Sequence, residues 1–170
     1  NAKVQPGGQG YCETGKAVTV LDKPTGPIDR SMGDVHPSGN PHFYLSPKAL
    51  AEGAKEIAAA LSRADGGHAA TYASGLDRFK ATMGKLDGEI DDLLAPVKKL
   101  QKAANGKPVV IEYHREFSYF LGAHGLTAFG SIEEKPGVPP SAGRLAEVAL
   151  AAKSGGVKAV PITGVTANTG

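Results

Sequence analysis

The stretch AATYASGLDRFKATMGKLDGEIDDLL, residues 69–94, decides the fold of this chain. Its large apolar residues recur at alternating intervals of four and three, which is the spacing of one face of an α-helix. The stripe predicts an amphipathic helix of roughly 28 residues, about 40 Å long. Such a helix exceeds the needs of one small domain and is long enough to run along two lobes. The stripe consists of Tyr72, Leu76, Phe79, Met83, Leu86, Ile90, Leu93 and Leu94.

Short motifs mark the ends of this helix and of the one before it. Ser46-Pro47 has the form of a helix start, because serine supplies a cap oxygen and proline loses no needed hydrogen bond there. That first helix is predicted to run to about Arg63, and Gly66-Gly67 separates it from the long helix. Pro96 is expected to stop or kink the long helix, leaving a short extension to Ala104.

Strand-like and helix-like segments alternate after the long helix. We expect strands at residues 108–113, 128–132 and 157–162, and helices at residues 114–123 and 141–153, with a proline-rich loop at 133–140. Strands that alternate with helices indicate a parallel sheet, since parallel neighbours need a crossover. Upstream of the first helix, residues 1–17 resemble a loop, residues 17–21 a short strand, and residues 22–41 a long irregular segment.

Composition excludes several classes of protein. The chain has 170 residues, a formal net charge of +2 and 41% hydrophobic residues, typical of a folded domain without a reason to bind nucleic acid or an anionic membrane. The single cysteine, Cys12, excludes an internal disulfide. The sequence contains no apolar run of about 18 residues that could span a membrane.

Candidate chemistry is concentrated in the five histidines, because the sequence has no common hydrolase, nucleotide-binding or CxxC motif. His42 lies between a proline-rich loop and the Ser46-Pro47 helix start. His114 follows a predicted strand at the carboxyl end of a parallel sheet, where ligands commonly bind. From this pattern alone, each of the two residues fits a metal ligand as well as a structural histidine.

The acidic pairs Asp91-Asp92 and Glu133-Glu134 are expected to have no catalytic role, and the first pair is expected to be solvated.

Three separated segments resemble, in the right order, the zinc- and manganese-binding solute-binding proteins of ABC importers (the cluster A-I family). Residues 29–47, DRSMGDVHPSGNPHFYLSP, are similar to the second metal-ligand segment of that family. Residues 113–125, YHREFSYFLGAHG, are similar to the third. Residues 132–145, with KPGVPPS at 135–141, match the loop and capped helix that follow.

The resemblance implies an α/β fold of two parallel-sheet lobes joined by a single long interlobe helix, with one metal ion in the cleft. Residues 1–66 would belong to the N-terminal lobe, 67–104 to the linking helix and its extension, and 105–170 to the C-terminal lobe. His42 would be the ligand from the first lobe and His114 the ligand from the second. The family's remaining ligands, an earlier histidine and a late carboxylate, are expected outside this chain.

The function implied is binding without turnover. A periplasmic or otherwise extracytoplasmic protein would capture Zn²⁺ as a monomer and deliver it to the membrane permease of an ABC importer. A histidine-rich site favours zinc, whereas two carboxylates in the remaining positions would favour Mn²⁺, and iron also stays open.

Two other functions remain open at this point. One is a metal-dependent adhesin that binds a macromolecule at a cell surface. The other is a zinc hydrolase, for which Glu112 or Glu116 would have to act as general base.

The remaining histidines have different expected roles. His36 is a candidate auxiliary ligand, because it lies in the same loop as His42. His68 is expected to be exposed at the start of the long helix. His124 is expected to be structural, near the C-terminus of a helix.

Overall fold

The structure is a computed structural model that describes residues 2–158 and 160–161. The described chain contains five α-helices, two strands and five short 3₁₀ turns, of which four precede the first helix. The helices are α1 (Pro47–Ala64), α2 (Ala69–Leu93), α3 (Ala95–Ala103), α4 (Ser118–Ala123) and α5 (Ala142–Gly155). The strands are β1 (Val110–Glu112) and β2 (Ala128–Ser131). The 3₁₀ turns are η1 (Ala2–Val4), η2 (Thr14–Ala17), η3 (Arg30–Met32), η4 (His42–Leu45) and η5 (Gly66–His68).

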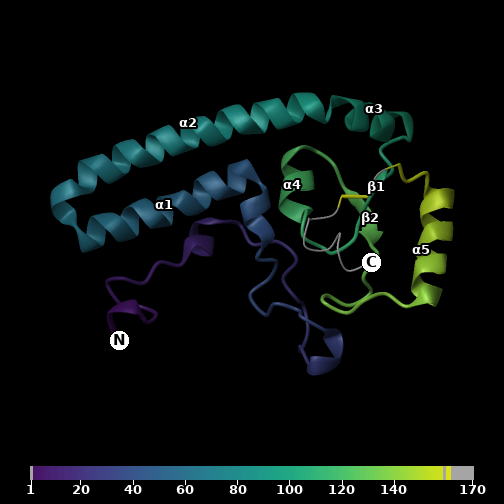
Figure 1. Ribbon diagram of the computed structural model, residues 1–170, viewed down its shortest axis with the longest axis horizontal. Helices are drawn as coiled ribbons and strands as arrows, with labels where there is room; N and C mark the ends of the chain where they lie inside the picture. Colours follow the sequence, from purple (N-terminus) through teal and green to yellow (C-terminus); the bar gives the residue numbers. More distant parts are fainter. Residues whose placement is uncertain (1, 159, 162–170) are drawn as a thin grey trace.

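Helices α1 and α2 form an antiparallel hairpin that extends from the rest of the molecule (Figure 1). The Ser46 side chain accepts the Ala49 N–H at 3.4 Å and Pro47 opens α1, as its cap motif predicts. The chain reverses through η5, and α2 then runs 25 residues to Leu93. Pro96 lies in the first turn of α3, so the predicted break and short extension are both confirmed.

The sheet is parallel, as the alternation of elements predicts. Its two strands pair Val110 with Ala128, and all three β1 residues are buried. The hydrophobic core of the described chain lies around this sheet, because α4 and the turn after it pack on β1 while α3 covers one side (Figure 1). The buried core cluster consists of Val109, Val110, Leu121 and Leu126, and Leu94 and Val97 are among the half-buried residues packed against it.

The strand predicted at residues 17–21 is not formed. The Leu21 N–H donates to the Tyr119 hydroxyl at 3.0 Å, and the Leu21 carbonyl accepts the Asn40 N–H at 2.9 Å. The backbone of Leu21 therefore bonds to a side chain and a loop instead of to a neighbouring strand. The segment preceding it also contains η1 and η2, where only a loop was predicted.

Helix α4 begins at Ser118, four residues later than the predicted start at His114. The buried Glu112 carboxylate accepts the Phe117 N–H at 2.7 Å, and the Glu116 N–H donates to the His114 carbonyl at 2.8 Å. These bonds hold residues 114–117 in a turn. A side chain from the preceding strand thus delays the helix, which a local helical pattern cannot indicate.

The third predicted strand, residues 157–162, lies partly outside the described residues, since positions 159 and 162 are not described. The described positions of this segment are not in a strand. One backbone bond, from the Lys158 N–H to the Val109 carbonyl at 2.7 Å, connects the segment to the start of β1.

His124 has the structural role predicted for it. It caps the C-terminus of α4, and its buried ring joins α4 to the long helix through a 3.0 Å contact between Nδ1 and an Asp91 oxygen. The Lys98 ammonium and then the His124 ring hold the pKa of Asp91 below its usual value. Asp91 is therefore half-exposed but engaged with two partners, whereas it was predicted to be simply solvated.

The described residues contain one two-stranded sheet, so the arrangement in two lobes stays a prediction. The long helix, the small parallel sheet and the α/β class are all observed. Among the described residues, no helix combines the length and apolar character needed to cross a membrane.

Tyr119 connects the N-terminal segment to α4. Its buried hydroxyl donates to the Asn40 carbonyl at 2.8 Å while accepting the Leu21 N–H, and its ring meets that of Phe43 edge to face, with centroids 6.4 Å apart. The Leu21 N–H and the Asn40 carbonyl, which are about half the chain length away from Tyr119 in sequence, thus both have the Tyr119 hydroxyl as hydrogen-bond partner.

We predict that Tyr119→Phe lowers the free energy of unfolding by about 1–3 kcal/mol, since it leaves two backbone groups without their partner. Tyr72→Phe is the matched control, because within the described part of the chain the Tyr72 hydroxyl bonds only to the exposed Asp65 carboxylate. This control should change stability by less than about 0.5 kcal/mol. Urea unfolding followed by circular dichroism measures both, and equal effects of the two substitutions would contradict the assignment.

Candidate metal centre

Asn40 positions the first predicted ligand, His42. The buried Asn40 side chain accepts the His42 N–H on Oδ1 at 2.9 Å. Its Nδ2 donates to an Asp22 oxygen at 2.9 Å and to the Arg115 carbonyl at 3.1 Å. The amide therefore ties the loop before His42 to the turn that follows His114, and it has no hydrogen-bonding group left over.

Close packing anchors the other side of His42. Phe43 lies against Gly53 of α1, where a Cβ would stand 3.1 Å from the ring, so only glycine permits this approach without a shift. Ser46, fully buried, starts α1 three residues later. The Tyr44 hydroxyl is 3.1 Å from the His42 Nδ1. The backbone of His42 is thus held from both sides, and Nδ1 is already in a hydrogen bond.

His114 is held from the opposite side of the cleft. It lies two residues after the end of β1, and its Nδ1 is 2.7 Å from Oε2 of Glu133. Glu133 follows β2, and its N–H donates to the Tyr113 carbonyl at 3.0 Å. Because the two strands are parallel, their carboxyl ends place these two side chains together.

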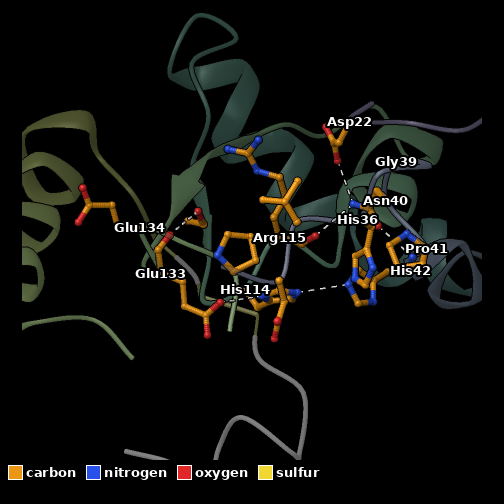
Figure 2. Close-up of a pocket in the computed structure, with 14 residues that line it drawn as sticks. Asp22, His36, Gly39, Asn40, Pro41, His42, His114, Arg115, Glu133 and Glu134 are labelled. Carbon is orange, nitrogen blue, oxygen red and sulfur yellow. Dashed lines mark hydrogen bonds and ion pairs between the residues drawn. The ribbon is translucent and has the colours of Figure 1, made fainter. Parts of the chain in front are cut away.

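The structure brings the two predicted ligands together. Nε2 of His42 and Nε2 of His114 are 3.2 Å apart, although the residues are separated by 72 positions. The rings are nearly perpendicular, with an interplanar angle of 89°. In Figure 2, Glu133, His114 and His42 form a row in which the His114 ring lies between the other two side chains. The two Nε2 atoms are within hydrogen-bonding distance of each other, and both residues line a cleft of about 230 Å³.

The electrostatic surroundings favour a cation. Arg115 is the one guanidinium among the described residues that line the cleft, and it is outnumbered by carboxylates. Burial, and then the neighbouring His114 and His36 rings, lower the pKa of His42 below the ordinary value of 6.5. His42 is therefore neutral at neutral pH, which is the form that binds a metal. The cleft carboxylates are those of Asp22, Asp34, Glu133 and Glu134.

The other candidate ligands are less well placed. His36 lines the same cleft, with its ring centroid 6.2 Å from that of His42, but its side chain is exposed. His68 is exposed, as predicted, and pairs with Asp65 at 2.8 Å. Within the described part of the chain, no three histidine, cysteine, aspartate or glutamate side chains are grouped so that they could hold a metal ion. The centre formed by these residues is therefore a pair of imidazoles.

Neither acid proposed as a hydrolytic base is found in the cleft. The Glu112 carboxylate is occupied by the Phe117 N–H, and burial raises its pKa. Glu116 is also buried, and its Oε1 has no hydrogen-bond partner among the described residues. Neither residue is among those described as lining the cleft. Neither of the two acids named in the hydrolase hypothesis is therefore placed to act as general base at the two imidazoles.

Two loops from opposite sides close one edge of the cleft. The Asp34 N–H donates to the Pro136 carbonyl at 2.8 Å. Gly33, with a φ of +77°, allows this contact, because a Cβ there would lie 2.4 Å from the same carbonyl oxygen. Gly137 has a φ of +75° and faces Asp34. Two glycines in the left-handed region therefore let the loops meet through their backbones.

Sequence reasoning missed Glu133 and Asn40 as parts of this site. The position of Glu133 could have been predicted from the sequence. Glu133 and His114 each follow one of two neighbouring parallel strands, so both residues should lie at the same edge of the sheet. Asn40 had none, since its partners Asp22 and Arg115 are far from it in sequence and no local pattern brings them together.

Comparison with known proteins identifies the family of the chain. The sequence model of the family described as "Zinc-uptake complex component A periplasmic" matches residues 5–167. The high-affinity zinc uptake system protein ZnuA of Brucella abortus (strain 2308) is 31% identical over 119 residues, which are 70% of this chain and 33% of the relative. The chain thus spans about a third of the length of that curated relative.

Solved structures show the same fold. A crystal structure of ZnuA superposes with a TM-score of 0.64 at 24% identity, covering 85% of this chain and 48% of that one. The solute-binding protein FpvC of Pseudomonas aeruginosa, in complex with Mn²⁺, superposes with a TM-score of 0.60 at 25% identity, covering 80% of this chain and 47% of its own. Since the family's sequence model extends over nearly the whole chain, the chain belongs to the ZnuA family of periplasmic zinc-uptake proteins.

Proposed function

We propose that this chain provides half of a zinc site in an extracytoplasmic binding protein, with His42 and His114 as ligands. One observation carries the proposal, the 3.2 Å distance between the two Nε2 atoms. Two nitrogens bound at about 2.0–2.1 Å to a tetrahedral Zn²⁺ stand about 3.3–3.4 Å apart. The observed pair therefore needs almost no movement to accept the ion.

Zinc suits these residues better than manganese does. Imidazole is a borderline ligand that favours Zn²⁺, whereas Mn²⁺ prefers carboxylate and carbonyl oxygens. The relative from Brucella abortus is named as a zinc uptake protein, while FpvC was crystallised with Mn²⁺. Two imidazoles make up half of a tetrahedral set, and we expect the remaining ligands from parts of the family fold outside this chain.

The biological role proposed is to capture the ion and deliver it to the membrane permease of an ABC importer. Membership of a periplasmic zinc-uptake family supports this role. Family members are binding proteins, which supports binding without turnover. We propose that the protein acts as a periplasmic monomer, its two lobes joined by α2.

We predict that His42→Ala and His114→Ala in the full-length protein each weaken zinc binding at least about 100-fold. Removing an outer-shell partner typically costs 10–100-fold, and a direct ligand should cost at least the upper end of that range. Competition against a chromophoric zinc chelator measures the affinity, while circular dichroism checks that each variant is folded.

His68→Ala is the matched control, because His68 is exposed and its only partner among the described residues is the exposed Asp65. It should leave zinc affinity unchanged. If His42→Ala and His114→Ala also left the affinity unchanged, the proposed site would be wrong.

The pH dependence of zinc binding follows from the state of His42. Because burial lowers the pKa of its ring, protons compete with the metal for Nε2 only below the ordinary pKa of 6.5. We therefore expect His42 to cause no loss of affinity between about pH 8 and about pH 7, and a fall in affinity below about pH 6.5. Zinc titrations across this range measure the effect, and an affinity independent of pH down to about pH 5 would contradict imidazole ligation.

A further inference from the structure

Glu133 is oriented toward the back of the His114 ring. Its Oε2 lies 2.7 Å from Nδ1 of His114 and also accepts the Gly137 N–H at 3.1 Å. The two side chains are mostly covered, with 10% of Glu133 and 19% of His114 exposed. One shielded oxygen thus bonds both the proposed ligand and the loop that follows β2.

The backbone fixes where this carboxylate stands. The Glu133 N–H bonds to the Tyr113 carbonyl, one residue before His114, and the Glu133 carbonyl accepts the Ser131 hydroxyl at 2.9 Å. Glu133 is therefore attached to the end of the sheet on both sides of its Cα. Its side chain has little freedom to leave His114.

We propose that Glu133 is a positioning residue for the metal centre, which fixes the tautomer and the orientation of His114. This inference rests on the proposed function. An ionised carboxylate only accepts hydrogen bonds, so the nitrogen of His114 that faces it has to carry the proton. A neutral His114 then presents the Nε2 lone pair to His42 and to the ion between them. Carboxylates that bond the second nitrogen of a ligating histidine act in this way at many metal sites.

The geometry separates this role from direct ligation by Glu133. Nδ1 and Nε2 lie on opposite sides of the imidazole, so the Oε2 that bonds Nδ1 stands behind the ring, away from the Nε2 pair (Figure 2). A second alternative is a purely structural brace, in which Glu133 serves only to hold the Gly137 N–H. That role would affect stability and leave the tautomer of His114 unchanged.

The first test is nuclear magnetic resonance of the full-length protein without metal, at a pH where the ring is neutral. Long-range ¹H–¹⁵N correlation spectra distinguish the two tautomers of His114. We expect the Nδ1–H form in the unmodified protein and a shift toward the Nε2–H form in Glu133→Ala. Glu134→Ala is the control, because Glu134 lines the same cleft but makes no hydrogen bond or ion pair within the described residues. It should keep the Nδ1–H form.

The second test is zinc affinity. We expect Glu133→Ala to weaken zinc binding by about 10–100-fold. Glu89→Ala, which removes an exposed carboxylate of α2 outside the cleft, is the control for affinity and should change it by less than about 2-fold. Glu133→Gln should restore part of the loss, because its amide oxygen still accepts the Nδ1 proton without supplying the charge.

The inference is overturned if Glu133→Ala leaves both the tautomer and the affinity unchanged, even where it lowers the unfolding temperature. A failure of the proposed function would look different. In that case His114→Ala would leave zinc binding unchanged, while the tautomer of His114 would still respond to Glu133→Ala.

Discussion

The bonds made by one buried amide, that of Asn40, hold the rest of the structure in its observed arrangement. Its backbone bonds to Leu21 and Tyr119, and its side chain bonds to Asp22, Arg115 and His42. Except for the local bond to His42, each bond joins segments that are separate in the sequence, so the amide holds the loop of His42 against the turn that follows His114. If one of these partners is removed, a buried polar group of Asn40 is left without a hydrogen bond. This lowers the free energy of unfolding by about 1–3 kcal/mol. The position of the first imidazole is thus a consequence of packing rather than of local conformation.

The second imidazole is positioned by different means. Parallel pairing of β1 and β2 brings the carboxyl ends of the strands together, and therefore brings His114 next to Glu133. The two halves of the cleft then meet through the backbone contact of Asp34 with Pro136. Two features support the proposed cation site between the imidazoles: burial lowers the pKa of His42, and four carboxylates line the cleft. The distance between the two imidazoles, the neutral state of His42 and the negative charge of the cleft carboxylates all favour a metal cation.

Most elements with a local cause could be predicted from the sequence. The start of α1 at Ser46-Pro47, the break at Pro96 and the parallel pairing of the strands are set by nearby residues and are observed as expected. Residues 17–21 were assigned to a strand because their apolar pattern cannot show that Tyr119 takes the Leu21 N–H. The late start of α4 has a similar cause, since the Glu112 side chain holds the turn before it. Of the site, the pair His42 and His114 was predicted, whereas its supports Asn40 and Glu133 depend on distant partners.

The central claim is that one zinc ion binds between His42 and His114. The most direct test is X-ray diffraction from crystals of the full-length protein with zinc, recorded on both sides of the zinc absorption edge. The account predicts one anomalous peak in the cleft, at about 2.0–2.1 Å from Nε2 of each residue. A zinc peak bound elsewhere, or bound to only one of the two rings, would contradict it.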